Sequence, residues 1–88
     1  MLNILVVGAT GYIGSALTSS LTRSGDHHVY GLARTAEKAL QLTKEEVTPI
    51  IGDINSPSLL SAIEDLHIDV VVDVSGANQY VIPFLLPL

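Results

Sequence analysis

The sequence predicts a three-layer α/β fold with a parallel sheet, and two features of its pattern carry that prediction. Four short apolar runs alternate with three stretches whose apolar residues recur at helical spacing. The connections between the runs are too long for hairpins, so we expect parallel strands joined by right-handed crossovers. Strands of such a sheet are buried on both faces, which explains why the runs are continuously apolar.

The first strand is expected over Ile4–Val7, and a helix follows the glycines that come after it. Gly25 is expected to end this helix, because glycine readily adopts the left-handed conformation of a C-cap. The apolar stripe of the helix has a spacing of four and consists of Ile13, Leu17 and Leu21.

The second strand is expected over residues 28–33, and Thr35 is a suitable N-cap for the helix after it. Glu37 would lie in the first turn of that helix, where an acidic side chain favours the helix dipole. The residues expected to face the sheet are Ala36, Ala39, Leu40 and Leu42.

The third strand is expected over residues 47–53, at an edge of the sheet because Pro49 cannot donate a ladder hydrogen bond. Ser56 and Pro57 predict the start of the third helix, as N-cap and first helical residue. The fourth strand is expected over residues 68–74. The apolar face of the third helix comprises Leu59, Leu60, Ile63 and Leu66.

Composition excludes several classes of function. The 88 residues carry a net charge of −5, and the four Lys and Arg residues form no basic stripe, which argues against nucleic-acid binding. There is no cysteine, so neither disulfides nor a thiolate zinc site are expected, and the three histidines lack metal-ligand spacing. No signal peptide or membrane span is recognisable, so we expect a soluble cytoplasmic protein.

The glycines at positions 8, 11 and 14 stand where the first strand ends and the first helix starts. Gly8 permits a sharp turn, Gly11 leaves space for a phosphate, and Gly14 lets the helix pack closely on the strand. Backbone N–H groups and the positive end of the helix dipole then favour a pyrophosphate. This context predicts dinucleotide binding; the alternative is a strand-to-helix turn with incidental glycines. A nucleoside-triphosphate P-loop is excluded, because no Gly-Lys-Ser/Thr follows.

The segment VVGATGYIG resembles the GxxGxxG fingerprint of the extended and atypical short-chain dehydrogenase/reductases, in particular their epimerase-like and NmrA-like members. The resemblance covers residues 1–76. It implies the first part of an NAD(P)-binding Rossmann-like domain, with a four-stranded parallel sheet of order 3-2-1-4 and three helices. In that family the glycines shape the pyrophosphate loop, and backbone N–H groups of the loop bind the phosphates. These positions here are Gly8, Thr10, Gly11, Tyr12, Ile13 and Gly14.

The resemblance also implies which cofactor is preferred. Arg34 ends the second strand, where a carboxylate would bind the ribose 2′-hydroxyl of NAD. A guanidinium can instead bind a 2′-phosphate, so NADP(H) is preferred over NAD(H), and Lys38 would add charge one helical turn later. The alternative for Arg34 is a solvated surface cation.

Two further segments match positions that hold the cofactor in the family. Asp53 and Ile54 would bind adenine, and Ser75 and Gly76 would lie beside the nicotinamide ribose. The alternatives are an ordinary aspartate in a turn and a loop of small residues.

The chain departs from the family after residue 76. The catalytic Tyr-x-x-x-Lys pair has no counterpart, because Phe84 stands four residues after Tyr80 and no lysine follows Lys44. Residues 77–88 show no strand or helix period, so they are expected to form an irregular apolar tail beside a truncated half-domain. The fourth strand would then be an apolar edge of the sheet, which invites self-association unless the tail folds back over it.

These observations predict an NADP(H)-binding module, with NAD also accommodated, that is related to oxidoreductases and epimerase-like proteins. No catalytic residue and no metal site is predicted in the chain. Two alternatives stay open: a redox-sensing regulator of the NmrA-like kind, and a truncated fragment that binds no cofactor and associates through its open sheet edge.

Overall fold

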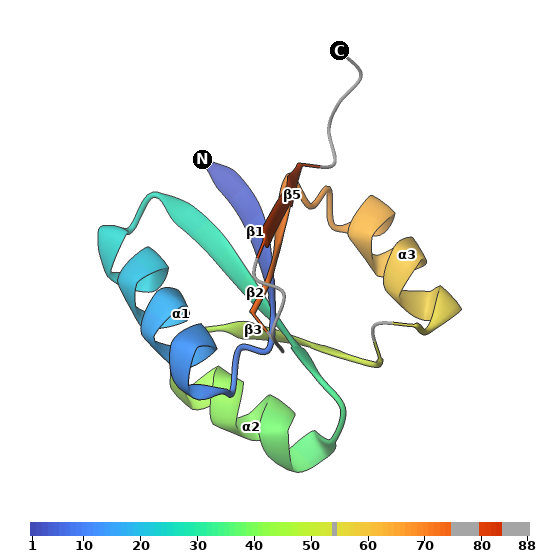
Figure 1. The fold of residues 1–88 in the computed structure, drawn as a ribbon, viewed down its shortest axis with the longest axis horizontal. Coiled ribbons are helices and arrows are strands. Elements are labelled where there is room, and N and C mark those ends of the chain that lie inside the picture. The colour runs from blue at the N-terminus through green and yellow to red at the C-terminus, as the bar shows by residue number, and fades with distance from the viewer. Residues whose placement is uncertain (54, 75–79, 84–88) are drawn as a thin grey trace.

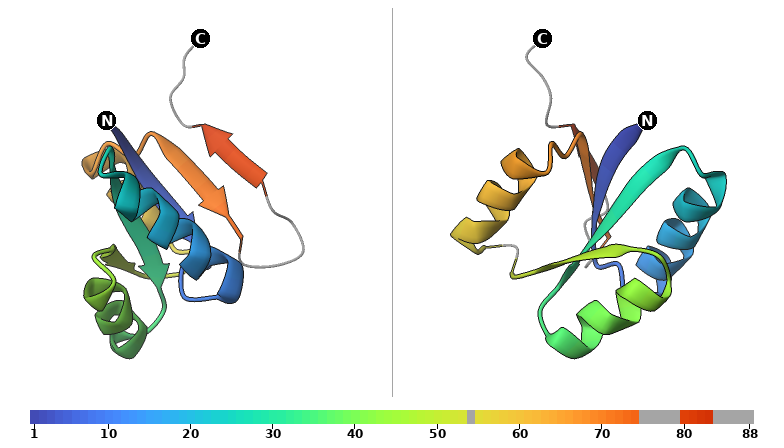
Figure 2. Two further views of the ribbon diagram at one scale, coloured as in Figure 1. Left: turned by 90° about the vertical axis from the view of Figure 1, so that its left-hand side faces the viewer. Right: turned by 180° about the vertical axis from the view of Figure 1, so that it is seen from behind.

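A computed structural model describes residues 1–53, 55–74 and 80–83, which form three layers around one sheet (Figure 1). The sheet has the order β3-β2-β1-β4-β5. Helices α1 and α2 cover one face and α3 covers the other (Figures 1 and 2). The elements are β1 (Leu2–Val7), α1 (Tyr12–Ser24), β2 (His27–Ala33), α2 (Ala36–Lys44), β3 (Thr48–Ile51), α3 (Pro57–Asp65), β4 (Val70–Asp73) and β5 (Tyr80–Pro83). The predicted parallel order 3-2-1-4 with three helices is confirmed.

Strand β1 lies at the centre of the sheet and supplies both cores. It pairs in parallel with β2 and β4, so that Ile4 lies between Val29 and Val70. Successive side chains of β1 point to opposite faces. Ile4 and Val6 pack with the side chains under α1 and α2, whereas Leu5 and Val7 pack with those under α3. This explains why the run is continuously apolar.

Four apolar residues expected to face the sheet do not: Ala36 is exposed, and so are three larger side chains. Ile13, Leu40 and Leu60 are 48%, 57% and 64% exposed. Each helix contacts the sheet through a narrow stripe, and adjacent helical residues are about 100° apart, so Ala39 and Leu59 are buried while the residues that follow them are not.

The helix ends follow from local sequence. The Thr35 hydroxyl accepts a hydrogen bond from the Lys38 amide at 3.2 Å, which confirms Thr35 as an N-cap. Gly25 caps α1 with φ +72°, and Ser56 and Pro57 start α3 as predicted. The chain leaves α3 through His67, whose φ is +54°. The Asn3 amide group stabilises that end, because it donates to the carbonyls of Leu66 and His67 at 3.1 Å each.

The expectation of an irregular tail is wrong for Tyr80–Pro83. These four residues form β5, which pairs antiparallel with β4 so that Val71 opposes Ile82. Strand β4 therefore has a neighbour on each side, and the open β4 edge expected from the sequence does not exist. The predicted self-association through that edge thereby loses the unpaired strand on which it rested. Strand β3 lies at the opposite end of the sheet, where Pro49 predicted an edge. Residues 77–79 and 84–88 of the predicted tail lie outside the described residues.

The contact between α1 and β1 leaves no space for a side chain at Gly14. A Cβ there would lie 1.9 Å from the carbonyl oxygen of Gly8. We expect Gly14→Ala to lower the free energy of unfolding by about 3 kcal/mol, because the helix must move off the strand. Denaturant unfolding measures this loss.

Gly11→Ala is the matched control. A Cβ at Gly11 would lie 3.3 Å from the same oxygen, and the residue is exposed. The smaller displacement should cost less stability than Gly14→Ala. Equal stabilities of the two variants would contradict this account of the contact.

Candidate functional site

A sharp turn connects β1 to α1 at the carboxyl end of the sheet. Gly8 has a φ of +89°, a backbone conformation that residues other than glycine rarely adopt. Its carbonyl oxygen accepts a hydrogen bond from the Gly11 amide at 3.0 Å. Gly14 then lies directly against Gly8. The roles predicted for Gly8 and Gly14, a sharp turn and a close helix contact, are thus met by the geometry.

The N-terminus of α1 offers backbone donors rather than a side-chain cap. The first backbone bond of the helix runs from the Ser15 amide to the Gly11 carbonyl at 2.8 Å. The amides of Tyr12, Ile13 and Gly14 precede this bond, so they have no acceptor within the helix. The N-cap is Gly11, which has no side chain, and the first turn contains no acidic residue. The positive end of the helix is therefore not neutralised locally.

A hollow of about 640 Å³ opens beside this helix end. Its wall follows one face of α1 and the turn before it. The residues that line it are Thr10, Gly11, Tyr12, Ser15, Ala16 and Ser19. The sequence prediction did not include the last three, although their spacing from Tyr12 places them on its helix face.

A second hollow, of about 450 Å³, lies between the turn and α2. It is lined by Thr10, Leu32, Ala33, Arg34, Thr35 and Lys38. Thr10 lines both hollows, so both border the glycine turn. Arg34 and Lys38 are brought together here as predicted, and the lining contains two cations and no carboxylate.

Asp53, which is predicted to hold adenine, lines neither hollow. Asp53 follows β3, and its carboxylate accepts a hydrogen bond from the Asn55 amide at 3.0 Å. This geometry is that of an Asx turn, so it supports the alternative in which Asp53 shapes its own loop. Its adenine contact stays a prediction. Ile54, Ser75 and Gly76 lie outside the described residues.

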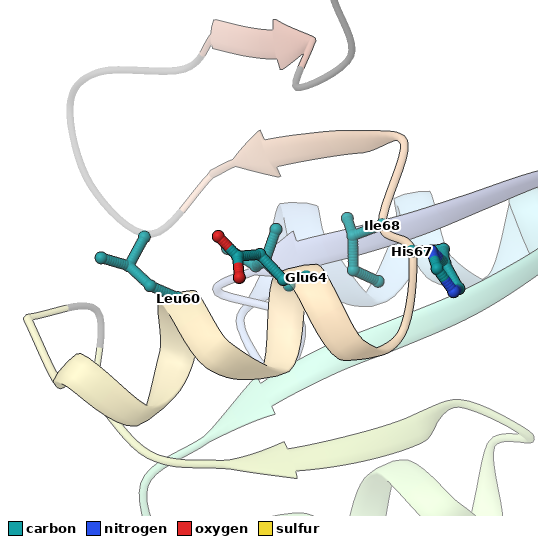
Figure 3. A pocket seen from close by; sticks show the side chains of 5 residues that line it. Leu60, Glu64, His67 and Ile68 are labelled. Atoms are coloured by element: carbon teal, nitrogen blue, oxygen red, sulfur yellow. The ribbon is translucent and has the colours of Figure 1, made fainter.

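A third hollow, of about 340 Å³, lies on the opposite face of the sheet (Figure 3). Figure 3 shows its side chains on α3 and on the segment that leads into β4. The lining residues are Leu60, Ile63, Glu64, His67 and Ile68. This apolar surface has neither a helix N-terminus nor a lysine or arginine. Its single acidic side chain, Glu64, disfavours an anion, and His67 is the one side chain of its lining that could donate to phosphate.

The histidines and acidic residues of the described part of the chain do not form a candidate metal site. No three His, Asp or Glu residues come together there. The His28 ring contacts Thr48 Oγ1 at 3.1 Å through Nε2 and the Tyr30 hydroxyl at 3.2 Å through Nδ1. It also stacks on Tyr30 with a centroid distance of 4.3 Å.

Among the same described residues, none of the helices has the length and apolar character needed to cross a membrane.

The parallel sheet, the glycine turn and the helix N-terminus together define a Rossmann-like nucleotide-binding fold. The family model of the NAD dependent epimerase/dehydratase family matches residues 4–82. The chain belongs to this family. The resemblance to epimerase-like proteins predicted from the sequence is thereby confirmed.

Several curated proteins are similar to this chain. The isoflavone reductase homolog A622 of Nicotiana tabacum is 37% identical, and the match covers 88% of this chain and 27% of the relative. The epimerase family protein YfhF of Bacillus subtilis is 37% identical, covering 90% of this chain and 24% of the relative. The N-acetyl-gamma-glutamyl-phosphate reductase of Yersinia pestis is 36% identical, covering 90% and 21%. The chain thus spans about a quarter of the length of the curated relatives it matches.

A solved structure from Bacillus halodurans, described as an NAD-dependent epimerase/dehydratase, has the same fold with a TM-score of 0.73. Its sequence identity is 25%, and the match covers 89% of this chain and 35% of that chain.

Thr35 holds the first turn of α2, and that turn carries Lys38 into the second hollow. We expect Thr35→Ala to lower the free energy of unfolding by about 1 kcal/mol, since the Lys38 amide loses its acceptor. Ser56→Ala is the matched control, because the Ser56 hydroxyl contacts Ser58 Oγ at 2.7 Å and caps no amide of α3. Urea unfolding of both variants tests the cap. An equal loss in the two would contradict it.

Proposed function

We propose that this chain is a nicotinamide-dinucleotide-binding module that prefers NADP(H) over NAD(H). The observation that carries the proposal is that two hollows border the glycine turn, both lined by Thr10. One lies at the uncapped N-terminus of α1, and the other is lined by Arg34 and Lys38. Membership of the NAD dependent epimerase/dehydratase family supports the same class of ligand.

The chemistry of the first hollow suits a pyrophosphate. The free amides at the start of α1 are donors, and the helix dipole favours negative charge there. In this proposal Thr10, Tyr12 and Ile13 supply the N–H groups. The glycines at 8, 11 and 14 let the helix pack closely on the turn and let the ligand approach the backbone. The hollow is open and large enough for a pyrophosphate.

The chemistry of the second hollow suits a 2′-phosphate. The Arg34 guanidinium can donate two parallel hydrogen bonds to phosphate oxygens, and Lys38 adds a positive charge. A ribose 2′-hydroxyl would need an acceptor instead, and the lining offers no carboxylate. The preference for NADP(H) rests on this difference.

The other contacts of the cofactor complete the proposal. Asp53 and Ile54 would hold adenine, and Ser75 and Gly76 would lie beside the nicotinamide ribose. When bound, the dinucleotide supplies hydride transfer, and this chain binds and orients it. The 88 residues contain no Tyr-x-x-x-Lys, so we assign no proton transfer to them. The absence of cysteine agrees with the reducing cytoplasm that we propose as its location.

Thermal unfolding of the chain with and without cofactor is the first test of the proposed function. A ligand that binds only the folded state raises the melting temperature. We expect a larger rise with NADPH than with NADH at equal concentration. No rise with either nucleotide would refute the proposal, and a larger rise with NADH would refute the preference for NADP(H) alone.

The selectivity of Arg34 is tested by Arg34→Ala. We expect the affinity for NADPH to fall by roughly tenfold or more, about 1.4 kcal/mol, and the affinity for NADH to change little, because only NADPH carries the 2′-phosphate. Isothermal titration calorimetry measures both constants.

Lys44→Ala is the matched control for charge. Lys44 is exposed at the far end of α2 and does not line the hollow. It should leave the NADPH affinity close to that of the unsubstituted protein. Equal losses for NADPH and NADH in Arg34→Ala would show that Arg34 does not bind the 2′-phosphate.

A further inference from the structure

Gly31 occupies the middle of β2, at a point where three parts of the fold converge. The residue is buried. A Cβ added to it would lie 2.8 Å from Leu42 Cδ1, 3.0 Å from Ala9 Cβ and 3.1 Å from Val47 Cγ1. All three distances are tighter than ordinary van der Waals contact. Methyl groups from other elements therefore fill the space that a side chain at Gly31 would take.

Two of these methyl groups belong to the elements that form the two hollows. Ala9 is part of the glycine turn and is 0% exposed, and its neighbour Thr10 lines both hollows. Leu42 is also 0% exposed and lies on α2, one turn after Lys38. The turn and α2 thus both place a methyl group in the space beside Gly31.

An added methyl group would have to displace one of these neighbours. The Leu42 side chain is flexible but enclosed, whereas the Ala9 methyl group is fixed to the backbone of the turn. At 3.0 Å, Ala9 must give way by a few tenths of an ångström, and the turn moves with it. Binding sites need their groups held to within about 0.5 Å, and a displacement of a few tenths of an ångström takes up much of that tolerance.

We propose that Gly31 is a positioning residue that sets the spacing between the glycine turn and the hollow lined by Arg34 and Lys38. The inference rests on the proposed function. A ligand with both a 5′- and a 2′-phosphate must reach the two places at once, so its affinity depends on their spacing. A ligand with only the 5′-phosphates is anchored at the turn and can follow its movement.

The test compares 2′,5′-ADP with 5′-ADP by calorimetry. In Gly31→Ala we expect the affinity for 2′,5′-ADP to fall roughly tenfold, an intermediate loss for a displacement well below 1 Å. The affinity for 5′-ADP should fall much less, so the ratio of the two affinities decreases. Adding Ala9→Gly to Gly31→Ala removes the contact at 3.0 Å and should restore much of the ratio.

Val29→Ala is the control for stability. Val29 is buried on β2, two residues before Gly31, and pairs with Ile4 rather than with the end of β1. Val29 belongs to the same core cluster as Ala9 and Leu42, but truncating it lowers stability without adding an atom between the turn and α2, so the affinity ratio should stay unchanged. If Val29→Ala lowers the ratio as much as Gly31→Ala does, Gly31 acts only through stability and the inference is overturned.

Amide resonances of the nucleotide-free protein give a readout that needs no ligand. Gly31→Ala should shift the amides of Thr10 and Gly11 in the turn and of Lys38 on α2, and Val29→Ala should not. Unshifted resonances would overturn the spacing role. If the unsubstituted protein binds neither nucleotide, the proposed function fails. If it binds both and Gly31→Ala leaves the ratio unchanged, only this inference fails.

Discussion

The site depends on the contact between the start of α1 and the end of β1. Gly14 lies so close to the Gly8 carbonyl that no Cβ fits between them. This contact places the first turn of the helix directly over the carboxyl end of the central strand, and it leaves the first amides facing outward. Ala9 and Gly31 repeat the principle one strand away, where two small residues bring the turn against β2. Missing side chains, rather than polar ones, therefore determine where the donors and cations lie.

Much of the fold could be predicted because the signals are local. A strand buried on both faces is continuously apolar, and β1 fills both cores with alternate residues. Caps such as Thr35 and Gly25 act within one helical turn. Strand β5 was missed because its signal is not local: Tyr80–Pro83 has no alternation, and its pairing with β4 is a tertiary contact. Leu40 and Leu60 were wrongly predicted to face the sheet, because the spacing of apolar residues shows which side of a helix is buried but not how wide the buried stripe is.

The site was predictable where backbone geometry specifies the residue type. Gly8 needs a positive φ and Gly14 needs a missing Cβ, so the glycine spacing locates the turn from the sequence alone. Ser15 and Ser19 were missed because small polar residues on a helix face are common and carry no signal of their own. Gly31 could not be recognised either, since the atoms that surround it come from three segments distant in the sequence. Only packing shows why a strand has glycine there.

Charge distribution explains how a chain with a net charge of −5 can present a site for an anion. Arg34 and Lys38 are two of its four lysines and arginines, and both line one hollow. Exposed charges are screened over about 8 Å at physiological ionic strength, so acids elsewhere on the surface act weakly there. The local field at the hollow is then set by Arg34 and Lys38, by Glu37 beside Lys38, and by the positive end of α1. The net charge opposes binding only at long range, and salt should reduce that opposition before it weakens close contacts with Arg34.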